Sequence, residues 1–98
     1  MQFSARVTNY QNNMMLNICD IDILGKNIVE GELHMNISES YYGEKLVEKE
    51  EAKKLLKQSS IINMVGKNTI SMSIELGIGS ENGIKTISNV PFLIVFKM

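Results

Sequence analysis

The sequence predicts an α+β fold, in which a small, mainly antiparallel sheet carries a pair of helices on one face. Residues 2–10 alternate apolar and polar side chains, with Phe3, Ala5 and Val7 on one side, which is the period of a half-buried strand. Residues 44–65 are instead rich in helix-forming residues. Because strands come first, then helices, then strands again, we expect segregated layers and not alternating βα units.

The first half of the chain is predicted to be extended. A polar cluster at 11–13 separates the first strand from a second one at 14–19, and the two are expected to form a hairpin. A short connection follows and ends at Gly25. A third strand is predicted over 33–37, with Gly31 marking its start or a bulge.

The second half is predicted to contain the helices and the closing strands. The first helix lies within 44–65, from about residue 47, and the second covers 68–76. Asn68 is the expected N-cap of the second helix, and Gly77 suits the position after its end. The last two strands are predicted at residues 84–88 and 91–96. The final strand has no polar alternation, so both of its faces are expected to be covered.

Length and composition describe one small cytoplasmic domain spanning residues 1–98. Ten basic and eleven acidic residues give a net charge of −1, which excludes a global field that would drive the chain onto nucleic acid or membranes. Any such binding needs a local patch. The single cysteine excludes an intrachain disulfide and favours a reducing compartment. The apolar stretches are too short to span a bilayer, so no membrane association is expected.

The tripeptide Gly-Lys-Asn occurs twice, at 25–27 and at 66–68, and resembles the end of a phosphate-binding loop. Such a loop needs a glycine five positions earlier and a hydroxyl directly after the lysine. Asp20 and Ile61 stand at the first position, and asparagine stands at the second in both cases. The two copies are therefore interpreted as turns, and no nucleotide or other cofactor is expected.

Cys19, Asp20, Asp22 and His34 are the residues from which an enzyme could be assembled. A cysteine nucleophile needs a nearby base, and His34 is the one histidine. The carboxylate of Asp20 would raise the pKa of the neighbouring thiol, which lowers its reactivity, so a structural thiol is the alternative reading. Asp20, Asp22 and His34 could also be considered metal ligands together with Glu32. Their spacing matches no zinc or EF-hand pattern, so no metal is expected.

Lys45, Lys49, Lys53 and Lys57 recur every four residues and carry the main functional prediction. On a helix beginning near residue 47, the last three would form one stripe that could contact a phosphate backbone, with Lys67 and Arg6 as support. The alternative is an ordinary solvated helix face, because several glutamates lie among these lysines. Tyr41 and Tyr42 precede a glycine, so one ring could cover the core while the other is exposed.

Three segments in order resemble the archaeal family called domain of unknown function 424. These are a Cys-Asp-x-x-x-Leu-Gly-Lys stretch at 19–26, a Tyr-Gly turn at 42–43 and an Asn-Met-Val-Gly junction at 63–66. The resemblance covers nearly the whole chain. Its motif positions, whose role the resemblance does not define, are Cys19, Asp20, Gly25, Lys26, Tyr42, Gly43, Asn63 and Gly66.

The chain departs from this family near its end, where Phe92 and Ile94 stand in place of a histidine and a glutamine. The resemblance implies an archaeal cytoplasmic protein, and the gene neighbourhood of the family implies a role in translation. We therefore expect a non-enzymatic protein that docks on the ribosome, ribosomal RNA or a translation factor. Two alternatives stay open: a small hydrolase or transferase, and a structural homodimer joined through an open sheet edge.

Overall fold

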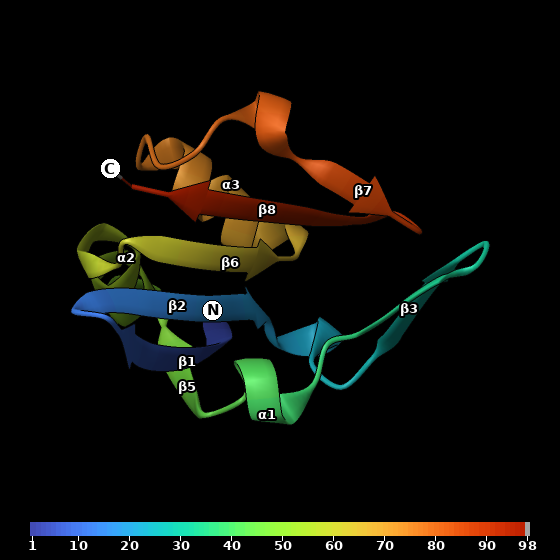
Figure 1. The fold of residues 1–98 in the computed structure, drawn as a ribbon, viewed down its shortest axis with the longest axis horizontal. Coiled ribbons are helices and arrows are strands. Elements are labelled where there is room, and N and C mark those ends of the chain that lie inside the picture. The colour runs from blue at the N-terminus through green and yellow to red at the C-terminus, as the bar shows by residue number, and fades with distance from the viewer. Residues whose placement is uncertain (98) are drawn as a thin grey trace.

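The computed structural model of the chain describes residues 1–97 and contains a six-stranded sheet, a separate two-stranded hairpin and three α-helices (Figure 1). The strands are β1 (Gln2–Tyr10), β2 (Asn13–Asp20), β3 (Asn27–Glu30), β4 (Leu33–Asn36), β5 (Lys45–Glu48), β6 (Ile61–Val65), β7 (Lys85–Ile87) and β8 (Val90–Phe96). The helices are α1 (Glu39–Tyr42), α2 (Lys49–Gln58) and α3 (Lys67–Glu75), with 3₁₀ turns η1 (Ile21–Ile23) and η2 (Glu81–Gly83).

The large sheet has the strand order β5-β1-β2-β6-β8-β7, and only the central pair β2–β6 is parallel. The predicted α+β class with a mainly antiparallel sheet is therefore confirmed. The β1–β2 hairpin is also confirmed. Its turn residues Gln11 and Asn12 have φ of 49° and 66°, and two successive positive φ values match the twist of the flanking strands.

One face of the sheet packs against α2 and α3 and forms the main core. Strand alternation places Phe3, Ala5, Leu16 and Ile18 on this face, and all four are almost completely buried. They belong to one cluster with the apolar side of α2, formed by Ala52, Leu55 and Leu56. The predicted packing of the helices on one face of the sheet thus agrees with the apolar periodicity of both the strands and α2.

The opposite face of the sheet is only partly covered. The β3–β4 hairpin projects from the sheet (Figure 1), and with α1 it covers a second apolar cluster at one end. Buried members of this cluster are Cys19, Ile28, Ile37, Tyr42 and Val65. Further along the same face, Ile94 and Phe96 are exposed. The prediction that both faces of the last strand are covered was wrong, because nothing among residues 1–97 covers this part of the sheet.

The prediction of one helix within 44–65 was also wrong at both ends. Lys45–Glu48 is an edge strand that pairs with β1, and Ile61–Val65 is the central strand β6. Helix α2 ends at Gln58, where the Ser59 hydroxyl donates to the Leu55 carbonyl oxygen at 2.6 Å. The apolar residues of 61–65 fit a helix or a strand, and only pairing with β2 and β8 decides between them.

Two smaller expectations were corrected by the structure. The predicted single strand near 33–37 is the second half of a hairpin, and Gly31 lies in the β3–β4 turn with φ of 61°. Asn68 is not the N-cap of α3. Gly66 holds that position, and the Asp20 side chain at the end of β2 accepts the first backbone N–H groups of the helix.

Candidate nucleic-acid interface

The second half of α2 carries the densest positive charge of the chain. Glu50 and Glu51 occupy its first turn, and after Glu51 no acidic residue occurs before Glu75. Lys53, Lys54 and Lys57 lie within this acid-free stretch. Because the apolar side of α2 faces the sheet, these lysines extend along its outer side.

Lys97, near the other end of the chain, joins these lysines in space. Its Nζ donates to the carbonyl oxygens of Leu56 at 2.6 Å and of Lys57 at 3.0 Å. These carbonyls belong to the last turn of α2, where the helix dipole favours a cation. Burial lowers the pKa of the Lys97 amine. We call the surface formed by Lys53, Lys54, Lys57 and Lys97 the basic end of α2.

The predicted lysine stripe is only partly assembled by the structure. Lys45 lies on β5, before the helix, and its Nζ contacts Glu51 Oε2 at 2.8 Å. Lys53 Nζ lies 3.7 Å from Glu50 Oε1. Lys49 is the first residue of α2 and lines a small hollow together with residues of α3. Lys53 and Lys57 are therefore the members of the stripe that lie in the basic end.

The two supporting residues predicted from the sequence lie elsewhere. Arg6 alternates with Phe3 and Ala5 along β1, so its side chain leaves the sheet on the face opposite to α2. Lys67 begins α3, at the opposite end of β6 from the α2–β6 connection. Sequence reasoning missed Lys54, for which the acid-free stretch was a signal, and Lys97, for which the sequence gives none.

The second Gly-Lys-Asn segment builds a helix terminus that is already occupied by a carboxylate. Asp20 Oδ1 accepts from the backbone N–H and the hydroxyl of Thr69 at 2.8 and 2.7 Å, and Asp20 Oδ2 accepts from the Asn68 N–H at 3.0 Å. A Cβ atom on Gly66 would lie 2.4 Å from Asp20 Cγ. The anion that a helix N-terminus attracts is therefore supplied by the protein itself.

The first Gly-Lys-Asn segment is a turn, as the sequence indicated. Gly25 has φ of 86°, and its N–H donates to the Ile37 carbonyl oxygen at 2.6 Å. The Ile37 N–H in turn donates to the Lys26 carbonyl oxygen at 2.9 Å. Both bonds tie the base of the β3–β4 hairpin together, and the N–H of Gly25 is thereby used within the protein.

The candidate catalytic residues do not converge. Cys19 is completely buried, and burial, with smaller contributions from Asp20 and Asp22, raises the pKa of its thiol to about 12. His34 is exposed on β4, on the strand face opposite to Met35, which packs against the cluster that contains Cys19. Among residues 1–97, no group of three or more His, Cys, Asp or Glu side chains is placed to hold a metal ion.

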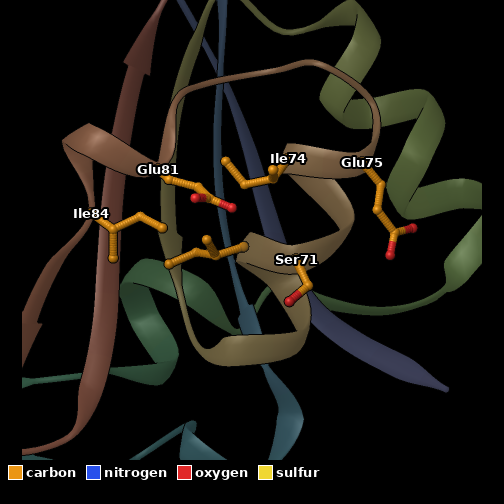
Figure 2. A pocket seen from close by; sticks show the side chains of 6 residues that line it. Ser71, Ile74, Glu75, Glu81 and Ile84 are labelled. Carbon is orange, nitrogen blue, oxygen red and sulfur yellow. The ribbon is translucent and has the colours of Figure 1, made fainter.

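A surface hollow of about 570 Å³ lies between α3 and η2 (Figure 2). Ile70, Ile74 and Ile84 form its apolar part, and the carboxylates of Glu75 and Glu81 line it as well. This charge would repel phosphate, so the hollow is not part of a nucleic-acid interface.

The model of a family described as protein of unknown function (DUF424) matches residues 8–98. The chain belongs to the DUF424 family. The fold is similar to that of a crystal structure of an uncharacterized conserved protein from Methanopyrus kandleri, with a TM-score of 0.80 and 22% sequence identity. That similarity covers 100% of this chain and 95% of the Methanopyrus chain. None of the curated proteins compared with this DUF424 member is similar to it in sequence.

The motif positions of this DUF424 chain hold the central strands and their connections together. The Tyr42 carbonyl oxygen accepts from the Ser4 hydroxyl at 2.8 Å, and Asn63 Nδ2 donates to Asn17 Oδ1 at 2.6 Å. A Cβ on Gly43 would lie 2.7 Å from the Glu39 carbonyl oxygen. The contacts of Asp20, Gly43 and Asn63 depend on their residue types, whereas Cys19 and Tyr42 are buried members of one apolar cluster. Of the two tyrosines, Tyr42 is buried and Tyr41 is exposed, as predicted.

No helix among residues 1–97 of this DUF424 member is long and apolar enough to cross a membrane.

Proposed function

We propose that the protein is a non-enzymatic, cytoplasmic component of archaeal translation that docks on ribosomal RNA through the basic end of α2. The observation that carries this proposal is that Lys97 Nζ binds the last turn of α2, the helix whose acid-free half carries Lys53, Lys54 and Lys57. Three lysines on the outer side of α2 and a fourth bound at its last turn give this helix end local positive charge on a chain whose net charge is −1. A local patch is what phosphate binding requires when the global field is absent.

The chemistry of the proposed contact is electrostatic. Each ammonium group replaces condensed counterions at a phosphate, and the release of these ions favours binding without reading the base sequence. The ion pair between Lys53 and Glu50 does not oppose this exchange strongly, because Glu50 is largely exposed and such surface pairs contribute little. Lys97 remains fixed by its two bonds to α2 and orients the patch.

A translation factor with an acidic surface is the second candidate partner for the same patch. The two candidates differ in salt dependence and in ribonuclease sensitivity, because only RNA supplies a continuous row of phosphates.

The first experiment measures binding of the full chain to a fluorescently labelled RNA duplex by anisotropy across a series of salt concentrations. For the double variant Lys53→Glu/Lys57→Glu we expect binding to be lost, while Lys57→Ala alone lowers the salt slope by about one. The matched control is Lys26→Glu/Lys85→Glu, which reverses the same charge at positions outside α2 and should bind like the wild type.

The second experiment follows the native protein on a sucrose gradient of cell extract at low and high salt. We expect comigration with ribosomal particles at low salt, loss of comigration at high salt, and loss after ribonuclease treatment. Comigration that resists salt and ribonuclease would instead assign the contact to a protein. Equal RNA binding by the Lys53→Glu/Lys57→Glu variant and the wild type would overturn the proposed interface.

A further inference from the structure

The outer edge of β8 is only half occupied. On this side β7 pairs with β8 through Lys85 opposite Phe92 and Ile87 opposite Val90, and its pairing ends there. On the other side β6 pairs with β8 as far as Phe96. Figure 1 shows β7 beside only one end of β8. Within residues 1–97, the part of β8 from Leu93 to Phe96 therefore has a strand neighbour on one side only.

The backbone groups of Ile94 and Phe96 point toward this open edge. The Lys97 N–H donates to the Ser60 carbonyl oxygen, and the Pro91 carbonyl oxygen accepts from the Gly66 N–H. The backbone N–H and C=O groups of odd-numbered residues in β8 therefore point toward β6. In an antiparallel ladder these groups alternate in direction along the strand. The N–H and C=O groups of Ile94 and Phe96 consequently lie on the side that has no partner strand.

The side chains at this edge are apolar and exposed. Ile94 is 59% exposed and Phe96 is 66% exposed, and both leave the sheet on the face opposite to α2 and α3. A groove of about 180 Å³ lies beside them, lined by Gly83, Lys85, Phe92, Leu93 and Ile94. Natural edge strands are usually protected by charges or by shortness; the open part of β8 is short, with four residues, but no residue from Leu93 to Phe96 is charged.

The other edge of the sheet is protected by charge as well as by shortness. β5 has four residues, Lys45–Glu48, and both its first and its last residue are charged. Of the two lysines near the open part of β8, Lys97 is directed to the carbonyl groups of α2, and Lys85 lies on β7 and lines the groove. The two edges thus differ in charge within the strand, which is one of the features that limit strand pairing between chains.

We infer that a second copy of this chain pairs with the open edge, β8 against β8, in an antiparallel arrangement around a two-fold axis at Val95. In this register Ile94 of one copy lies opposite Phe96 of the other, and the same contact occurs twice, which is the self-complementarity of a two-fold interface. The outward N–H and C=O groups become paired, and each apolar pair adds cross-strand packing. A register centred on Ile94 would place Phe96 of the second copy opposite Phe92, where Lys85 of β7 already lies.

This pairing produces one continuous sheet through both copies. Side chains opposite each other in an antiparallel ladder lie on the same face, so α2 and α3 of both copies cover the same face of the joined sheet. Both basic ends of α2 then point to the same side. The inferred dimer does not depend on the proposed RNA contact, since it is held by the backbone of β8 with Ile94 and Phe96 and is tested without RNA.

The first test measures the mass of the full-length chain in solution by sedimentation equilibrium over a range of concentrations. The interface is short, so we expect a dimer with a dissociation constant on the order of micromolar. Ile94→Lys places a charge on the edge and should reduce the mass by half. Leu46→Lys, at a similarly exposed position on β5, is the matched control and should leave the dimer intact.

The second test fixes the register. Val95→Cys places two thiols across the two-fold axis, where an oxidant should link them into a covalent dimer, whereas Leu46→Cys should not cross-link. Cys19 is buried and does not interfere. A wild-type chain that is monomeric at about 100 µM, well above a micromolar constant, would overturn the inference. A dimer that persists in Ile94→Lys, or that forms no Val95→Cys cross-link, would also overturn it.

Discussion

The carboxylate of Asp20 accepts both the backbone N–H and the side-chain hydroxyl of Thr69, at 2.8 and 2.7 Å. Asp20 ends the central strand β2, and Thr69 lies in the first turn of α3, so this contact connects the sheet to the helix. It also performs the capping that the sequence predicted for Asn68. A capping side chain that is distant in sequence does the same work as a local one, because the orphan N–H groups need only an acceptor.

The first prediction concerns this cap. Asp20→Ala removes the acceptor of two backbone N–H groups and one hydroxyl, so it should lower the free energy of unfolding by about 2 kcal/mol, the upper end for an N-cap. Urea denaturation measures the change. Asp22→Ala is the control, because Asp22 is exposed and should change stability by less than about 0.5 kcal/mol. Equal effects at both positions would show that Asp20 does not cap α3.

The second prediction concerns the glycine that lies against this carboxylate. Gly66 has φ of 110°, and a Cβ there would lie 2.4 Å from Asp20 Cγ. Gly66→Ala should therefore destabilise the fold by at least about 2 kcal/mol through backbone strain and displacement of the cap. Gly31→Ala tests strain alone, because Gly31 has φ of 61° with nothing within 4 Å of a Cβ. If the two variants were equally stable, the close contact between a Cβ at position 66 and Asp20 would not affect the free energy of unfolding.

The third prediction concerns the Cys19 thiol. Its pKa is raised to about 12, chiefly by burial, so almost no thiolate exists at neutral pH. Iodoacetamide should leave the native protein unmodified for hours and label Cys19 rapidly in urea. The mass of the intact chain measures the reaction. Fast labelling of the native protein at neutral pH would contradict the structural role of Cys19 and favour the enzyme alternative.

The fourth prediction is a loss of stability in alkali. Folding raises the pKa of Cys19 from 9.0 to about 12 and that of Tyr42 from 10.0 to about 12, in both cases mainly by burial. The folded state thus keeps both protons where the unfolded chain releases them. The contribution of these two groups to stability should be constant below pH 9 and fall between pH 9 and 12. Thermal unfolding measures this, and Cys19→Ala should reduce the fall that begins at pH 9.

The fifth prediction concerns the buried amide of Asn17. Asn17 Oδ1 accepts from Asn63 Nδ2 at 2.6 Å, and Asn17 Nδ2 donates to the Tyr41 carbonyl oxygen at 3.1 Å. Asn63→Ala leaves the Oδ1 atom without its protein donor and should cost about 1–3 kcal/mol. In a double-mutant cycle, Asn17→Ala and Asn63→Ala together should cost less than the sum of the single changes. Additive costs would show that the two amides act independently.

Elements whose signals are local could be predicted from the amino-acid sequence. Alternation in 2–10 and the polar residues at 11–13 define the β1–β2 hairpin, and residue types alone place helices near α2 and α3. Gly77 follows α3 as predicted, with φ of 75° and its N–H donating to the Ile74 carbonyl oxygen at 2.9 Å. Each of these signals depends on neighbours within a few residues of the same segment.

Features that depend on contacts between distant segments could not be predicted in this way, because they arise when the chain packs. Residues 61–65 became the central strand because β2 and β8 offer ladder partners on both sides, which the local pattern does not encode. Asp20 became the cap of α3, and Lys97 joined the lysines of α2, across 40 or more positions of sequence. Local propensities are small in free energy, so pairing and burial override them wherever the two disagree.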